Sequence, residues 1–347
     1  MSISACITSL SGPVLLNEER AFLREAQPWG VILMGRSCVS RVQVRDLVSD
    51  VKAALGRDAL IFIDQEGGRV ARLKAPEWPR FPAAATYGAL HSADEAAGVE
   101  ACRLGHQLMA MELSSLGIHA DCAPVADLRQ PSTHDAIGDR AFGFSVDVVV
   151  SLAEAALEGL TAGGVVGCLK HMPGQGRSSV DSHYDLPRVS ESAELLELDF
   201  SVFRGLADNA VMGMTGHVSY DAFMPGEAAT VSATIISEII RKRIGFEGLL
   251  MTDDLGMSAL GGSLADRGTR ALAAGCDMLL HCSGFVQEPD AILVEMQEIA
   301  GAAGTLGGVS LERAERAETA VIAPVDFDRE AGWARLTDLL SQAQAGA

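Results

Sequence analysis

Positive charge is scarce in this 347-residue chain, which carries 27 Lys and Arg against 46 Asp and Glu and a formal net charge of −19. Binding to nucleic acid or to an anionic membrane surface relies on clustered Lys and Arg side chains that neutralise phosphates. We therefore expect neither nucleic acid nor a membrane as a partner. The acidic balance favours solubility and is compatible with a neutral or modestly charged small-molecule substrate.

The chain also lacks the cysteine spacing of a disulfide framework or a zinc site. Its seven cysteines are odd in number and scattered, without a C-x-x-C pair. Free, buried thiols in a reducing compartment are the simplest interpretation. The opening segment MSISACITSLSGPVLLNEER has no basic region and no long apolar run, so it resembles neither a signal peptide nor a membrane anchor. We expect a cytoplasmic protein.

Eight short apolar runs, each followed by glycine or polar residues, alternate with segments of helical period. One such segment covers 149–160 and ends before Gly163, and another covers 235–240 and ends before Gly245. This alternation predicts a parallel sheet covered by helices. The runs occupy residues 3–10, 30–35, 59–68, 117–128, 164–174, 209–218, 248–257 and 275–284.

Eight repeats favour a closed barrel over an open sheet. A doubly wound sheet would usually carry a G-x-G-x-x-G fingerprint after its first strand, and none occurs there. The predicted fold class is α/β, a single-domain TIM-like (β/α)8 barrel. It covers residues 1–347, with a C-terminal helical tail from about residue 300.

Polar side chains gather after the apolar runs, where a parallel barrel places its active site. One such residue alone is more often a helix cap or an ion-pair partner than a catalyst. Many of them at one end of a sheet favour a functional site. The candidates after strands are Asp64, Lys170, His171, His217, Asp253 and Asp254, and those in loops are Arg69, Arg72, Arg140, Asp181 and His183.

Two pairs among these candidates have informative spacing. Asp253 and Asp254 are adjacent, so in extended backbone only one can point into the barrel mouth, and the other should cap a helix or hold a neighbouring loop. Asp181 and His183 are two residues apart, which would put both side chains on one side of an extended loop. A carboxylate paired with an imidazole is the orienting logic of a catalytic dyad, although a surface turn is an equal alternative. The preceding segment PGQGRSSV suits a mobile loop.

Several of these segments together resemble glycoside hydrolase family 3, and within it the short, NagZ-type β-N-acetylglucosaminidases. The resemblance rests on IDQEGGRVARL, IGDRAFG, KHMPGQGRSSVDSHYDLP, GFEGLLMTDDLGM and AGCDMLLHC, in that order along the chain. It implies a retaining hydrolase that removes terminal β-linked N-acetylglucosamine without a cofactor or a metal. It further implies a small-molecule glycan substrate, a GlcNAc-anhydroMurNAc peptide of cell-wall recycling, and we expect a monomer.

The resemblance also assigns roles to individual residues. Asp253 matches the family nucleophile, His183 the general acid/base, and Asp181 the partner that orients it. An imidazole with an ordinary pKa near 6.5 can donate and then accept a proton around neutrality. The residues implied to bind the terminal sugar are Asp64, Arg72, Arg140, Lys170 and His171.

Two motifs depart from the family pattern. The usual K-H-F-P-G-H-G is KHMPGQG here, with Met172 and Gln175, and the usual P-A-T-x-S is AATVS at residues 228–232. Neither change removes a residue with an implied catalytic role. Gln175 lies in the loop that leads to His183, so loop closure and leaving-group preference are the properties open to change.

Three other functions remain as alternatives. A metal-dependent amidohydrolase-like barrel would use Lys170, His171, His217 and Asp253 around a metal, although the H-x-H expected after an early strand is missing. An aldolase would use Lys170 as a Schiff-base lysine. A non-catalytic sugar-binding barrel is the third, and the intact Asp253, Asp181 and His183 give it no support.

Overall fold

The computed structural model describes residues 2–178, 180 and 186–345. Eight strands form one parallel sheet in the order β10-β7-β5-β4-β3-β2-β1-β11. Each of the eight predicted apolar runs coincides with one of these strands, and only β2 begins before its run, by two residues. They are β1 (Ser4–Thr8), β2 (Pro28–Leu33), β3 (Leu60–Ile63), β4 (Ala120–Asp121), β5 (Val166–Met172), β7 (Met212–Thr215), β10 (Leu249–Met251) and β11 (Leu279–Leu280).

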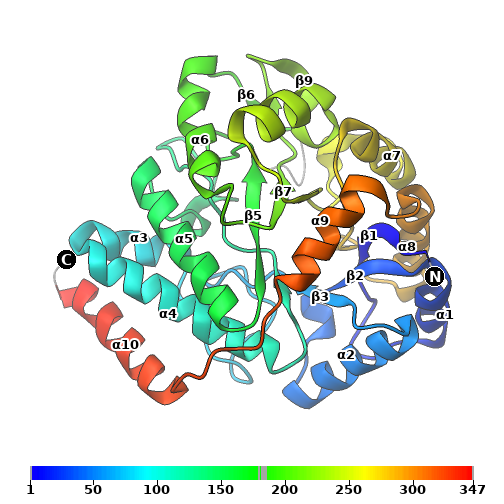
Figure 1. Cartoon of the computed structure of the whole chain (residues 1–347), viewed down its shortest axis with the longest axis horizontal. Helices are drawn as coiled ribbons and strands as arrows, with labels where there is room; N and C mark the ends of the chain where they lie inside the picture. Colours follow the sequence, from blue (N-terminus) through cyan, green and yellow to red (C-terminus); the bar gives the residue numbers. More distant parts are fainter. Residues whose placement is uncertain (1, 179, 181–185, 346–347) are drawn as a thin grey trace.

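The sheet is closed into a barrel, since its two end strands, β10 and β11, also contact each other. A parallel bridge joins Met251, at the end of β10, to Met278, just before β11. The backbone N–H of Asp277 donates to the carbonyl of Leu250 at 2.8 Å, and that of Thr252 donates to Met278 at 3.0 Å. The predicted TIM-like (β/α)8 barrel is therefore confirmed, with helices around the strands (Figure 1).

Helices fill the connections between consecutive strands, as the alternating pattern predicts. The predicted helix over 149–160 is α5, which gives way to Gly163 and then to Gly164 at a positive φ of 86°. The helices are α1 (Asn17–Ala26), α2 (Arg41–Leu55), α3 (Ala84–Ala93), α4 (Glu95–Ser114), α5 (Val146–Ala162), α6 (Ala193–Leu206), α7 (Leu264–Ala274) and α8 (Pro289–Ala303).

The helix predicted around 235–240 is present as η4 (Ile235–Ile244), with π-type hydrogen bonding, and it ends at Gly245 with a positive φ of 83°. Short 3-10 turns occur at strand ends and loops, as η1 (Gly35–Ser37), η2 (Gly138–Arg140), η3 (Ala229–Val231) and η5 (Ser258–Leu260). A small second sheet, in the order β6-β8-β9, joins the segments after β5 and β7. Its strands are β6 (Arg188–Val189), β8 (Ser219–Tyr220) and β9 (Met224–Ala228).

The chain beyond residue 303 forms two further helices, α9 (Gly308–Thr319) and α10 (Arg329–Ala345). Figure 1 shows α10 lying beside α4, far from it in sequence. The two are tied by Arg335, whose guanidinium donates to both oxygens of Glu100 at 2.8 and 2.6 Å. Within the described ranges, every helix is too short or too polar to cross a membrane.

Candidate active site

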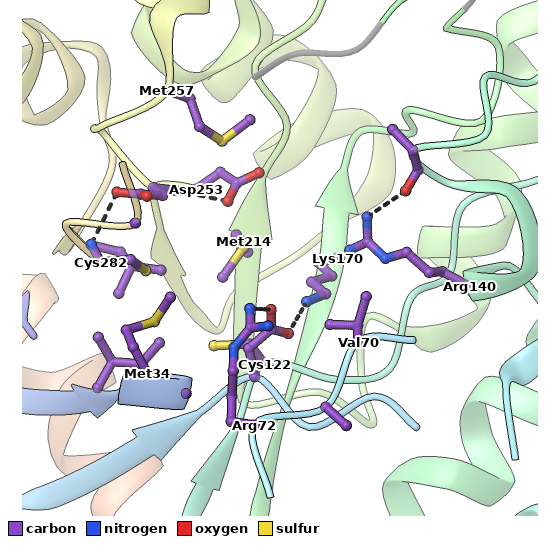
Figure 2. Close-up of a pocket in the computed structure, with 18 of the residues that line it drawn as sticks. Met34, Val70, Arg72, Cys122, Arg140, Lys170, Met214, Asp253, Met257 and Cys282 are labelled. Atoms are coloured by element: carbon purple, nitrogen blue, oxygen red, sulfur yellow. Dashed lines mark hydrogen bonds and ion pairs between the residues drawn. The ribbon is translucent and has the colours of Figure 1, made fainter. Parts of the chain in front are cut away.

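A cavity of about 580 Å³ opens at the carboxyl ends of the strands. Side chains at the end of β5 and just after β2, β3 and β10 point into it, and Figure 2 shows several of them facing one another. Most of the polar residues that the sequence singled out meet here. The lining includes Asp64, Arg69, Arg72, Arg140, Lys170, His171, Asp253 and Asp254, together with apolar side chains such as Met34, Met214 and Met257.

One wall of the cavity is a connected set of opposite charges. Asp64 accepts hydrogen bonds from Arg72 at 2.7 Å and from Lys170 at 2.8 Å. The Lys170 ammonium also lies 2.6 Å from a carboxylate oxygen of Glu66. Glu66 in turn accepts two hydrogen bonds from Arg140, at 2.8 and 2.7 Å. The alternation of carboxylates and cations lets nearly buried charges stabilise one another.

These contacts set the protonation states of the wall. Burial disfavours the charged form of Lys170, but Asp64 and Glu66 outweigh it and raise the pKa of Lys170 well above its ordinary value. Burial likewise opposes ionisation of Glu66, yet Arg140 and Lys170 hold the pKa of Glu66 far below its usual range. The wall therefore keeps fixed donors and acceptors at neutral pH, which suits a ligand rich in hydroxyl groups.

The imidazole of His171 is oriented by the buried carboxylate of Asp127. Its Nδ1 lies 2.7 Å from a carboxylate oxygen of Asp127, which is fully buried. The other oxygen of Asp127 accepts the backbone N–H of Gln175 at 2.6 Å. With Nδ1 engaged by the carboxylate, Nε2 is the atom of His171 left to face a ligand.

Asp253 lies across the cavity from the charged wall, at the end of β10 (Figure 2). Its Oδ1 accepts the backbone N–H of Asp254 at 2.7 Å. Burial raises the pKa of Asp253, but the neighbouring His171 and His217 and this N–H outweigh burial, so the net pKa lies below the ordinary value. Asp253 is therefore an ionised carboxylate held in place at the lining of the cavity.

Asp254 turns toward the neighbouring loop, as expected from its adjacency to Asp253. Its Oδ1 accepts the backbone N–H groups of Gly256 at 2.9 Å and Cys282 at 3.0 Å. The same oxygen lies 3.2 Å from Nδ1 of His281, which is completely buried. Asp254 therefore joins the loop after β10 to the loop after β11.

His217 does not line the cavity, although its place after β7 suggested that it would. It is fully buried, with Nδ1 at 2.7 Å from the hydroxyl of Thr230 and Nε2 at 3.1 Å from the carbonyl of Asp254. Burial lowers the pKa of His217. The side chain supports the strand ends beneath Asp253 rather than facing a ligand.

Asp181 and His183, the dyad expected from the sequence, lie outside the described residues. The segment that leads to them is packed in its first part, and the mobility expected for the loop PGQGRSSV stays a prediction. Gln175 is buried, and Arg177 donates to Asp199 at 2.5 Å. A Cβ at Gly176 would meet the carbonyl oxygen of Leu128 at 2.0 Å, so the backbone fits closely there.

Three residues of the site were missed by the sequence reasoning. Glu66 stands two residues after Asp64 in the same IDQEGG segment, a spacing that places both on one side of an extended chain. Asp127 and His281 each follow an apolar run, in APVAD and DMLLH. Asp64 and His171 were selected because they are polar residues that come just after an apolar run. The same criterion selects Glu66, Asp127 and His281.

A parallel α/β barrel with an ionised carboxylate facing fixed donors and acceptors at the strand ends has the arrangement of a glycoside hydrolase. The chain belongs to glycosyl hydrolase family 3, whose N-terminal-domain model matches residues 9–320. A curated relative from Alkalilimnicola ehrlichii named β-hexosaminidase is 39% identical over 290 residues, which is 82% of each chain. Another with that name, from Xanthomonas campestris pv. campestris, is 35% identical over 85% of this chain and 88% of its own. The chain's enzyme class is thus that of the β-N-acetylhexosaminidases, which are O-glycosyl hydrolases.

Solved structures agree with this family. Native NagZ from Neisseria gonorrhoeae superimposes with a TM-score of 0.85 at 27% identity, covering 98% of both chains. The complex of the same protein with N-trifluoroacetyl-D-glucosamine gives a TM-score of 0.81 at 28% identity, covering 98% of this chain and 99% of the other. The likeness extends over essentially the whole barrel.

Proposed function

We propose that the chain removes terminal, non-reducing β-linked N-acetylglucosamine by a retaining mechanism with Asp253 as the nucleophile. The observation that carries the proposal is the placement of Asp253, an ionised carboxylate across the cavity from the Asp64–Lys170–Glu66–Arg140 wall. An oxocarbenium-like transition state requires a carboxylate on one face of the anomeric carbon and a proton donor near the leaving oxygen. A structural relative that binds N-trifluoroacetyl-D-glucosamine supports the choice of sugar.

The reaction proceeds in two steps. A carboxylate oxygen of Asp253 forms a bond to the anomeric carbon while the bond to the leaving oxygen breaks and His183 donates a proton to that oxygen. His183 then takes a proton from water, whose oxygen attacks the anomeric carbon and releases Asp253. Asp181 orients His183. These two residues take their roles from the D-S-H motif, since they lie outside the described part of the chain.

The charged wall binds the terminal sugar. Asp64 accepts hydrogen bonds from neighbouring hydroxyls, while Arg72, Arg140 and Lys170 donate to oxygens of the ring substituents and His171 offers its Nε2. Arg72 and Lys170 already hold the Asp64 carboxylate, at 2.7 and 2.8 Å. Sugar binding therefore costs little conformational entropy at this side chain. That rigidity favours a single orientation of the sugar relative to Asp253.

The natural substrate we propose is a GlcNAc-anhydroMurNAc peptide released during cell-wall recycling. The NagZ-type relatives support this proposal. We also propose that the enzyme works in the cytoplasm, with which its seven free cysteines agree. We further propose that the enzyme acts as a monomer and that residues 1–347 work as one catalytic domain.

Two alternative chemistries fit the side chains less well. A Schiff-base lysine must lose its proton, but Lys170 is held as an ammonium by two carboxylates at 2.8 and 2.6 Å. A metal site using His217 would need a ring nitrogen free to bind, and both of its nitrogens are engaged at 2.7 and 3.1 Å.

The direct test is the initial rate on an aryl β-N-acetylglucosaminide beside the matching aryl β-glucoside. We expect the N-acetyl compound to be preferred by at least about 100-fold in kcat/KM, because a site that hydrogen-bonds a substituent discriminates strongly against its absence. Equal rates would contradict the preference for the N-acetyl sugar. A folded enzyme that turns over neither compound would contradict the proposed reaction.

A further inference from the structure

A buried histidine links the outside of the barrel to the loop that carries Asp253. His281 follows β11 and is completely buried, with Nδ1 at 3.2 Å from Asp254 and Nε2 at 3.0 Å from Glu295 of α8. The imidazole thus lies between two carboxylates, one on each side of the ring. Neither the nucleophilic attack nor the binding of the sugar, as proposed above, uses this arrangement.

The connection continues from His281 to the nucleophile through Asp254. The side chain of Asp254 is held by His281 and by the N–H groups of Gly256 and Cys282, and its own backbone N–H donates to Oδ1 of Asp253 at 2.7 Å. A displacement of the Asp254 backbone would therefore move the hydrogen-bond donor that orients the attacking carboxylate. Space is tight at this point, because a Cβ at Gly256 would meet the His281 ring at 3.1 Å.

The charged and titratable groups around His281 come from several elements. Asp254 and Asp253 follow β10, Glu295 belongs to α8, and the Cys282 thiol is adjacent in sequence. Arg36 follows β2 and interacts electrostatically with Asp254, Glu295, Glu19 and Cys282, and its guanidinium donates to the carbonyls of Cys282 at 2.9 Å and Ser283 at 3.1 Å. Two carboxylates thus touch the imidazole directly, while Arg36 is occupied by backbone carbonyls.

We infer that His281 is a positioning residue for the reaction, which as an imidazolium between Asp254 and Glu295 fixes the Asp254 N–H that aligns the Asp253 carboxylate. The inference rests on the proposed function of Asp253. Loss of the imidazolium charge would loosen Asp254, which would then be held by the Gly256 and Cys282 N–H groups alone, and would let the attacking oxygen of Asp253 shift relative to the anomeric carbon. Misplacement of a reacting group by about 1 Å can cost about 100-fold in rate.

The protonation state of His281 supports this role. Burial lowers its pKa, but the contacts with Asp254 and Glu295 outweigh burial and raise the pKa to about 9. A group with a raised pKa keeps its charged form below that value, so the alignment is present at neutral pH and is lost as the pH rises through about 9. The enzyme should therefore lose activity on the alkaline side for a reason separate from the titration of His183.

The experiment uses a dinitrophenyl β-N-acetylglucosaminide, whose leaving group departs without a proton. This substrate removes the dependence on His183 as an acid, so kcat/KM against pH reports the groups that align Asp253 in the free enzyme. The wild type is compared with His281→Gln and Glu295→Gln. The control is His119→Gln. His119 is part-buried, lies just before β4 at the other end of the barrel, and has its Nδ1 near the carbonyl of Gly164.

We expect the wild-type kcat/KM to be level near neutrality and to fall as the pH rises through about 9. His281→Gln should lower kcat/KM by about 10- to 100-fold at neutral pH and should remove the alkaline fall. Glu295→Gln, which removes one carboxylate from the imidazole, should move the fall down by about one pH unit. His119→Gln should match the wild type.

An unchanged rate and an unchanged alkaline fall in both His281→Gln and Glu295→Gln would overturn the inference. If His281→Gln fails to fold, the position of the fall in Glu295→Gln decides, because a purely structural contact would not move it. The failure of the proposed function would look different. In that case the wild type would not turn over the substrate, or Asp253→Ala would be as active as the wild type.

Discussion

The Asp253→Ala variant is expected to lose at least about 10⁴-fold in kcat on aryl β-N-acetylglucosaminides, because it removes the group that forms the covalent intermediate. The fold should persist, since Asp253 is only partly buried and its described side-chain hydrogen bond is with the adjacent backbone N–H. The measurement is a steady-state rate with the dinitrophenyl glycoside, together with the thermal unfolding midpoint of both proteins.

Azide distinguishes a lost nucleophile from a damaged site. The small anion can enter the space vacated by the carboxylate and attack the anomeric carbon from the same face, so azide should restore part of the rate and give the α-glycosyl azide. The control is Asp208→Ala, which removes an exposed carboxylate before β7, at the opposite end of the barrel, and should behave like the wild type. Near-normal activity in Asp253→Ala would rule out Asp253 as the nucleophile.

The Glu66→Ala variant is expected to lose about 3 to 5 kcal/mol of the free energy of unfolding, because it leaves two buried cations short of a partner. The side chains of Lys170 and Arg140 are only 3% and 13% exposed, and both contact Glu66 within 2.8 Å. Denaturation by urea measures the loss. Glu66→Gln, which keeps an acceptor but removes the charge, should lie between the wild type and Glu66→Ala.

The chain offers a matched control for this prediction. Glu100 accepts bidentate hydrogen bonds from Arg335, at 2.8 and 2.6 Å, as Glu66 does from Arg140, but this pair lies on the surface between α4 and α10. An exposed ion pair contributes less than about 1 kcal/mol, so Glu100→Ala should be nearly neutral. A Glu66→Ala variant no less stable than Glu100→Ala would show that the wall does not depend on charge pairing.

The barrel could be predicted from the sequence because its local and global signals agree. Each strand is a short apolar run, and helices such as α5 end at glycines where a left-handed turn is needed. The meeting of Asp64, Lys170 and Asp253 could be predicted as well, because parallel strands bring their carboxyl ends together. For the same reason the alternation of side chains turns the Asp254 carboxylate toward the loop after β11, although Asp254 still lines part of the cavity.

What the sequence could not supply were partners set by packing between distant elements. The contact of His281 with Glu295 depends on how α8 lies against the barrel, and the pairing of Glu66 with Arg140 spans 74 positions of the chain. The packing of Gln175 against Asp127 likewise follows from tertiary fit.

The most direct test of the central claim is the configuration of the sugar first released, followed by proton NMR during rapid hydrolysis of a β-N-acetylglucosaminide. Two displacements at the anomeric carbon, the first by Asp253 and the second by water, restore the original configuration. We expect β-N-acetylglucosamine to appear first and the α anomer to follow only by slow mutarotation. Initial release of the α anomer would mean a single displacement by water and would contradict a covalent role for Asp253.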